Sequence, residues 1–333
     1  MAKSVLLPFC KPIFATIQET AAVGLAINGH PTAYNGILNQ CVSLGCSRKF
    51  LRGLTSSPIV YIPLLNISAF EFIDKFSNTG RFGVSNYRDD VKRMLDEGYY
   101  VLFTNVDDFY VPGKSWYGVR HMPHDGIICG YDDNDETFSI ASYDSNWVFN
   151  LFRTPQSCFV EGANACYENK QYGEITAYKI KPNTTVKLDM DMILKKLKRH
   201  LECTVETIPL DRGHVVEGAV VYDLLAMYID KLKDESIPPD KMDWRAFRPV
   251  WEHKCAMLDR IKAIEAEKGW DSKLSLSYVP LVSQANYIRG MYAMYHKNRK
   301  VGLLDQIRKS LIELRQRECD ILQDLVRKME GAS

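Results

Sequence analysis

A histidine and an aspartate stand at the two ends of a predicted β-hairpin in the middle of the chain. His124 precedes the apolar run Gly126–Cys129, a turn follows at residues 130–135, and Phe138–Tyr143 returns to Asp144. The two ends of an antiparallel hairpin lie side by side, so an imidazole and a carboxylate meet there. A carboxylate that orients an imidazole makes a general base. The pattern predicts His124 as the base and Asp144 as its orienting group.

A cysteine near the start of the chain supplies the nucleophile for this pair. Cys10 stands just before Pro12 and a helical pattern over Ile13–Leu25, and proline suits the first turn of a helix. The helix dipole lowers the pKa of a thiol at this end, and nearby main-chain N–H groups can stabilise an oxyanion. Cys41 and Cys46 open no helix. We therefore predict Cys10 as the nucleophile.

Other residues of the hairpin leave alternatives for the orienting group. Ser142 shares a strand face with Asp144, since side chains alternate along a strand, and Asn146 offers an amide. Either residue could replace Asp144. His121 lies three residues before His124, but no third ligand stands nearby, so we predict no metal site.

The composition is that of a globular protein without a charged partner. The chain has 333 residues, 46% hydrophobic and 25% charged, with a formal net charge of +1. This balance gives no reason to expect nucleic acid or acidic lipid as a partner. Nine scattered cysteines, no pair spaced Cys-x-x-Cys, no export signal and no long apolar run predict a cytoplasmic protein with reduced thiols.

The chain divides into two predicted domains, residues 1–184 and 185–333. In the first, we expect helices over Ile13–Leu25, Phe70–Phe76 and Asn86–Glu97. Strands at Tyr99–Phe103 and Gly173–Lys181 join the histidine hairpin in an antiparallel sheet. The second domain is predicted to be all-helical, with helices over 190–201, 215–233, 244–267, 280–296 and 301–329. The fold class is therefore α+β.

These features resemble a known family. Cys10 before a helix, His124 in His-Asp-Gly-Ile-Ile-Cys-Gly-Tyr-Asp, and Asp144 after the next strand are similar to the papain-like cysteine fold. Within that fold the chain resembles the butirosin-biosynthesis acyltransferase-like family, with its bacteriocin-processing-peptidase-like N-terminal domain. The other resembling segments are 98–101, 107–112, 251–254 and 257–261. Papain-like peptidases carry a glutamine shortly before the nucleophile; this chain has none there, which leaves the oxyanion partner open.

The resemblance implies a cysteine-dependent acyl or aminoacyl transferase of nonribosomal peptide or polyketide-type antibiotic biosynthesis. The acyl group would pass from a carrier-protein thioester through acyl-Cys10 to an amine or hydroxyl acceptor. The implied partners are an acyl or peptidyl carrier protein and a small-molecule acceptor, and the only cofactor chemistry is the carrier's phosphopantetheine arm. The helical domain would be a lid, a docking surface or, through residues 301–329, a homodimer contact. The alternatives are a peptidase or amide hydrolase of the same fold, and a non-catalytic binding or scaffold protein.

Overall fold

The chain forms two compact units in a computed structural model. The structure describes residues 3–52, 58, 60–61, 70–78, 87–202, 215–238 and 242–331. The first unit comprises Met1–Tyr34 and Phe70–Val186, and the second comprises Asn35–Ala69 and Lys187–Ser333. The second boundary lies close to the predicted residue 184. The segment Asn35–Ala69, predicted in the first domain, groups instead with the helices of the second unit.

The first unit is built on an antiparallel sheet. Its strand order is β4-β9-β5-β6-β7-β8, with β1 pairing with β6 outside this path. The strands are β1 (Ser4–Leu6), β4 (Ile73–Asn78), β5 (Tyr100–Asp107), β6 (Pro123–Asp132), β7 (Thr137–Tyr143), β8 (Phe149–Pro155) and β9 (Ile175–Ile180). The histidine strand and the strand that returns from it are β6 and β7, so this hairpin is confirmed. The α+β class is confirmed with it.

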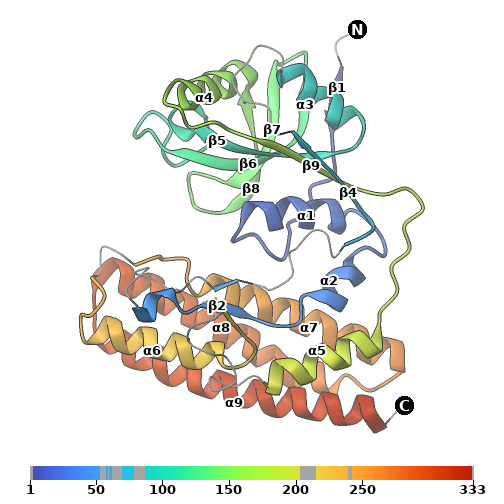
Figure 1. Cartoon of the computed structure of the whole chain (residues 1–333), viewed down its shortest axis with the longest axis vertical. Helices are drawn as coiled ribbons and strands as arrows, with labels where there is room; N and C mark the ends of the chain where they lie inside the picture. The colour runs from blue at the N-terminus through green and yellow to red at the C-terminus, as the bar shows by residue number, and fades with distance from the viewer. Residues whose placement is uncertain are drawn as a thin grey trace. The chain divides into compact units, whose positions relative to one another are not determined.

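Helices cover both faces of this sheet. The helices are α1 (Gln18–Asn28), α3 (Tyr87–Asp96) and α4 (Gln156–Glu168). Figure 1 shows α3 and α4 on one side of the sheet and α1 on the other. The alternation of side chains along β5 explains this arrangement. Val101 and Phe103 pack in the core cluster with α3 and α4, while the Tyr100 hydroxyl, on the opposite face, donates a hydrogen bond of 2.6 Å to Pro8 O.

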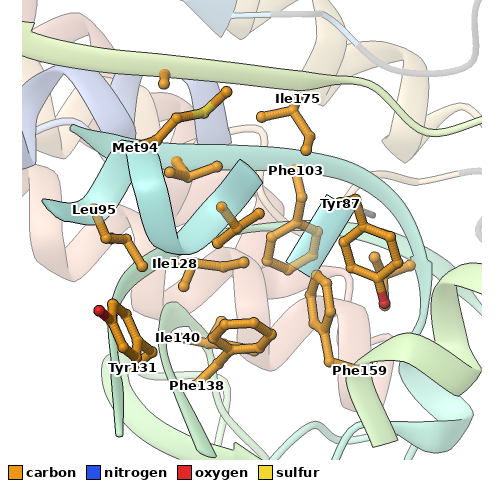
Figure 2. Packing of buried hydrophobic residues seen from close by; sticks show 14 of the residues in the cluster. Tyr87, Met94, Leu95, Phe103, Ile128, Tyr131, Phe138, Ile140, Phe159 and Ile175 are labelled. Carbon is orange, nitrogen blue, oxygen red and sulfur yellow. The ribbon is translucent and has the colours of Figure 1, made fainter. Parts of the chain in front are cut away.

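The core between the sheet and its two covering helices is aromatic at its centre. The Phe159 ring of α4 packs edge-on against Phe103 and Phe138, at centroid distances of 4.8 and 5.4 Å, and lies 6.1 Å from Tyr87 of α3 (Figure 2). All four side chains are buried. Full burial of side chains of this size contributes about 1.5–3 kcal/mol each. This core holds β5 and β6, the strands whose ends carry the candidate site.

A glycine in the histidine strand permits the crossing of β1. A Cβ added to Gly130 would lie 2.3 Å from the backbone oxygen of Val5. Leu7 N donates to Cys129 O at 2.8 Å just beyond the paired residues. The glycine of the Cys-Gly-Tyr-Asp sequence is therefore needed for close backbone approach, rather than for the turn that follows it.

Two local predictions for the first unit are wrong. The segment predicted as a helix at Phe70–Phe76 contains the start of β4, which pairs with β9 along its whole length. The cross-strand hydrogen bonds override the local helical pattern. The helix predicted from Ile13 begins later, at Gln18, and has no side-chain cap. Cys10 therefore does not open a helix.

The second unit is mainly helical but is not all-helical as predicted. Its helices are α2 (Tyr34–Gln40, which starts in the first unit), α5 (Met190–Glu202), α6 (Val221–Lys233), α7 (Arg248–Lys268), α8 (Lys273–Asn298) and α9 (Gly302–Gly331). A small antiparallel sheet joins β10 (Val215–Glu217), β2 (Gly45–Ser47) and β3 (Val60–Tyr61). Residues 215–217, predicted as the start of a helix, thus form a strand. No helix in the described part of the chain has the length and apolarity needed to cross a membrane.

A charged cluster lies in the interior of the helical unit. Glu318 of α9 accepts hydrogen bonds from Lys254 of α7, Tyr222 of α6 (2.6 Å) and Tyr278 of α8 (2.5 Å), and all four side chains are buried. Burial, the largest single effect, raises the pKa of this carboxyl group, but the Lys254 ammonium, its hydrogen bond and the two neighbouring histidines together more than offset it, so the pKa of Glu318 is lowered. Four helices therefore meet on one ionised and fully hydrogen-bonded carboxylate.

Two stacked histidines lie in the same interior. The rings of His200 (α5) and His253 (α7) are 5.5 Å apart at an interplanar angle of 24°. Both are fully buried, and Nε2 of His253 lies 2.7 Å from the Val42 carbonyl oxygen. Burial lowers the pKa of His200 to about 4, so this ring is neutral at pH 7.

Candidate functional site

His124 lies at the beginning of β6, next to an irregularity in its pairing with β5. It pairs with Val106 of β5, and the register shifts between Phe103 and Val106. Asn105, within this bulge, has a φ of +53°, and its N–H donates to Asp125 Oδ1 at 3.3 Å. Bulges of this kind redirect neighbouring side chains. Asp125, the residue after His124, thus stabilises the bulge in β5.

The carboxylate beside His124 belongs to Asp108. Asp108 follows β5 directly, and its backbone N–H donates to Met122 O at 3.0 Å. Its Oδ2 lies 3.1 Å from His124 Nδ1. A carboxylate can only accept, so we assign the Nδ1 proton to the histidine, which leaves the Nε2 lone pair available. Asp108 is buried, whereas the His124 side chain is 32% exposed. The His124–Asp108 pair therefore has the form of an oriented general base.

A buried lysine holds this carboxylate in place. Lys114 Nζ lies 3.3 Å from Asp108 Oδ1 and 3.4 Å from His124 Nδ1, and donates to Ser142 Oγ at 2.8 Å. Burial lowers the pKa of Lys114, and the charge of Asp108 opposes that shift. The contact of His124 Nδ1 with the carboxylate is shorter than that with the ammonium, in agreement with the proton assignment above. Lys114 therefore holds the Asp108 carboxylate in position.

Ser142 joins this group to the start of α1. Its Oγ receives hydrogen bonds from Lys114 Nζ and from Gln18 Nε2 (3.3 Å), and donates to Asp125 O at 3.3 Å. Ser142 is fully buried and uses its donor and both acceptor sites. It is therefore a structural hydroxyl rather than a nucleophile. Gln18 is the first residue of α1, so the amino end of this helix borders the site.

A second histidine–aspartate pair lies next to the first. His121 Nδ1 is 2.7 Å from Asp107 Oδ2, and Asp107 Oδ1 accepts from the backbone N–H groups of Phe109 (3.1 Å) and Met122 (2.9 Å). The His121 ring stacks on Phe109 with a centroid distance of 4.3 Å. A Cβ on Gly162 of α4 would lie 2.9 Å from Asp107 O. The close approach of α4 thus fixes the backbone that carries both aspartates.

Asp144 and Asn146, the other orienting groups considered from sequence, belong to a turn. Asp144 Oδ1 accepts from the N–H groups of Asn146 (2.8 Å) and Val148 (3.1 Å). Trp147, between them, has a φ of +59°. None of the hydrogen bonds and ion pairs in the described ranges joins His124 to either side chain. Asp144 fixes the turn before β8, and Asp108 takes the place beside His124 that the sequence assigned to Asp144.

Cys10 and His124 are not brought together. Asn28, the last residue of α1, donates from Nδ2 to the carbonyl oxygens of Cys10 (3.5 Å) and Lys11 (3.0 Å). Gln18, the first residue of the same helix, contacts Ser142 in the histidine site. Ten residues separate the two ends of α1, a distance of about 15 Å along the helix. Cys10 is exposed at the far end of α1 from the His124–Asp108 pair.

A different thiol lies nearer to the two aspartates. Cys166 of α4 is influenced electrostatically by Asp107 and Asp108, but it is buried, and burial raises its pKa to about 11. At pH 7 it is therefore a protonated thiol and a poor nucleophile. Along the described segments, no hydrogen bond joins a cysteine side chain to the His124–Asp108 pair.

Three residues of the site, Asp108, Lys114 and Gln18, were not predicted from the sequence. Asp108 had a usable signal. Tyr99–Phe103 was predicted as a strand, and in an antiparallel sheet the end of that strand lies beside the start of the next, where His124 stands. Lys114 gave no signal, because a single lysine in a loop is normally exposed.

The site can orient a general base and stabilise the negative charge that develops on an oxyanion. It does not resemble a metal centre. In the described part of the chain, no group of three or more His, Cys, Asp and Glu side chains is placed to hold a metal ion. The sequence matches no protein-family model and no curated protein. The function is therefore inferred from the His124–Asp108 pair and its neighbours.

Proposed function

We propose that this protein is an acyltransferase in which His124, oriented by Asp108, is the general base. An acyl group on a thioester would pass directly to an amine or hydroxyl acceptor, without an acyl-cysteine intermediate. The observation that carries the proposal is the 3.1 Å contact between His124 Nδ1 and the buried Asp108 carboxylate, which leaves Nε2 available on a partly exposed ring. The choice of acyl transfer comes from the sequence resemblance.

The proposed reaction needs one proton transfer in each direction. The acceptor attacks the thioester carbonyl while His124 Nε2 takes its proton, and a new C–N or C–O bond forms. The C–S bond then breaks, and the imidazolium returns the proton to the leaving thiolate. Asp108 stabilises the imidazolium, as a carboxylate does in a catalytic triad. The uncapped amino end of α1 begins at Gln18, beside this pair, and its positive dipole favours the developing oxyanion.

The alternative is a non-catalytic binding protein that keeps the fold. It is favoured by the placement of Cys10 at the other end of α1 from His124. Hydrolysis is the related enzymatic alternative, in which water takes the place of the acceptor at the same base.

The test measures thiol release and product formation with acyl-pantetheine thioesters and a panel of amine and hydroxyl acceptors. We expect His124→Gln to lower the rate roughly 10²–10⁴-fold, the usual contribution of a general base. Cys10→Ser is the matched control and should retain the wild-type rate, with no acyl adduct on the protein by intact mass spectrometry. An acyl group on Cys10, lost together with activity in Cys10→Ser, would restore the covalent mechanism. Equal catalysed rates in wild type and His124→Gln would refute His124 as the base, and no turnover by the wild type would leave the binding protein as the better explanation.

A further inference from the structure

Large apolar side chains are exposed on the two loops that border the histidine site. Their exposed fractions are 50% for Tyr117, 72% for Val119, 38% for Met122, 44% for Trp147 and 46% for Val148. We call these five residues the apolar face. Single exposed apolar residues are common, but a group of them on adjoining loops marks a binding surface.

Backbone and ring contacts join the two loops into one surface. Ser145 N donates to Gly113 O at 2.8 Å, and Ser115 Oγ donates to Asp144 O at 3.1 Å. The rings of Trp116 and Trp147 pack edge to face at a centroid distance of 6.3 Å. Gly113 and Ser115 flank Lys114, the buried lysine of the histidine site. The contacts between the two loops therefore lie on either side of Lys114, which is paired with Asp108 in the histidine site.

Both loops have a fixed conformation. The Asp144 carboxylate binds the N–H groups of Asn146 and Val148, and Trp147 N donates to Asp144 O at 2.9 Å. In the other loop, Gly118 N donates to Phe109 O at 2.9 Å. Residues held in this way lose little conformational entropy when a ligand binds. The face is thus organised before any ligand arrives.

One cation lies at the edge of the apolar face. The Arg120 guanidinium lies over the Trp116 ring, 5.6 Å from its centroid. Arg120 is exposed. Among the residues that the structure describes, no carboxylate forms an ion pair with its guanidinium. A guanidinium supported by a ring and not neutralised by an acid suits a phosphate group. The surface therefore pairs an apolar area with one site for an anion.

From this arrangement we propose that the apolar face binds the acyl donor. This inference rests on the proposed acyl transfer. The occupant is an acyl thioester with an apolar chain and a phosphate on its thiol arm. The chain lies on Tyr117, Val119 and Trp147, the phosphate binds Arg120, and the thioester carbonyl reaches His124.

The test measures binding rather than turnover, by isothermal titration of the full-length protein. The probes are butanoyl and octanoyl thioesters of 4′-phosphopantetheine, and octanoyl pantetheine, which lacks the phosphate. We expect the longer chain to bind about tenfold more tightly, since four added methylene groups become partly buried. Val119→Ser with Trp147→Ser should remove most of this difference. Leu276→Ser, at a 68% exposed leucine of α8, is the control and should leave binding unchanged.

The phosphate is tested by a double comparison. Loss of the phosphate should weaken binding about fivefold or more in wild type, on the scale of a charge-assisted contact, and should have no effect in Arg120→Gln. Equal affinities for the two chain lengths, or an equal phosphate effect in Arg120→Gln, would overturn the inference. The inference would also be overturned if the protein bound phospholipid vesicles more tightly than the thioester probes and lost that binding in the Val119→Ser, Trp147→Ser double variant.

The outcome is separable from that of the proposed reaction. His124→Gln should keep the dependence of binding on chain length and on the phosphate, because it leaves the apolar face and Arg120 intact. Binding with the expected chain and phosphate dependence but without turnover would refute the acyl transfer and keep the site. Turnover without that dependence would refute the site and keep the reaction. Far-ultraviolet circular dichroism of each variant shows that it is folded.

Discussion

Replacement of Asp108 by asparagine tests the central pair of the site. Asp108→Asn keeps the size of the side chain and removes its charge. Lys114 Nζ then stays buried without the carboxylate charge that lies 3.3 Å away, and the amide has one acceptor oxygen for the two positions that now face Lys114 Nζ and His124 Nδ1. We expect a loss of both stability and activity.

The magnitude follows from the Lys114 charge. Two unit charges 3.3 Å apart attract by about 5 kcal/mol at an effective dielectric constant near 20. Lys114 can escape by losing its proton, which costs an ordinary lysine about 5 kcal/mol at pH 7 and costs less here, because burial lowers its pKa. Removal of one partner of a buried ion pair usually destabilises by about 3–5 kcal/mol. We expect Asp108→Asn to fall in this range and to lower activity roughly 10²-fold or more.

The assay combines urea unfolding, hydrogen exchange of β5 and β6 by mass spectrometry, and the thioester reaction. Adding Lys114→Met removes the unpaired cation, so the double variant should recover much of the stability but none of the activity. The matched control is Asp144→Asn, which changes a carboxylate in the turn before β8. Its free energy of unfolding should stay within about 2 kcal/mol of wild type, the scale of weakened hydrogen bonds in one turn. Its His124-dependent activity should be unchanged. A stability change under about 1 kcal/mol in Asp108→Asn, or equal activity losses in Asp108→Asn and Asp144→Asn, would refute the reasoning.

Two further predictions concern the interior of the helical unit. In the folded protein the pKa of His200 is lowered from 6.5 to about 4, so between pH 4 and pH 6.5 the unfolded chain binds more protons than the folded protein. The contribution of this residue to stability is therefore present above pH 6.5 and is lost as the pH falls toward 4. This residue should lower the free energy of unfolding by about 2 kcal/mol between pH 7 and pH 5. The free energy of unfolding of His200→Leu, measured with urea, should therefore depend less steeply on pH. The same pH dependence in wild type and variant would exclude the neutral buried ring. Glu318→Gln leaves Lys254 charged and buried, and should cost about 3–5 kcal/mol in the same assay. Adding Lys254→Met should recover most of that loss, and a double variant no more stable than Glu318→Gln would contradict the ion-pair explanation.

The sequence predicted the elements whose signals are local. An unbroken apolar run with a Gly-Tyr-Asp-Asp-Asn-Asp turn predicted the β6–β7 hairpin, and the three-to-four residue spacing of Leu304, Ile307, Leu311 and Leu314 predicted α9. Both are confirmed: the consecutive apolar residues of the hairpin are buried on both faces of the sheet, and the leucine and isoleucine row of α9 is buried along one face of the helix. Phe70–Phe76 and Val215–Glu217 were predicted as helical, but both contribute to strands. Their backbones pair with segments far away in the chain, and such pairing leaves little trace in a local window.

The candidate site divides in the same way. The sequence by itself determined that His124 lies at the start of an apolar strand, since that depends only on neighbouring residues. The tertiary structure alone decided which carboxylate lies beside it. The pairing of β5 with β6 brings Asp108 to His124, whereas Asp144 is used to fix its own turn. The start of α1 at Gln18 likewise placed Cys10 at the opposite end of that helix. Residue types set the available chemistry, but distances between side chains depend on strand register and helix ends, which are set by packing of the whole unit.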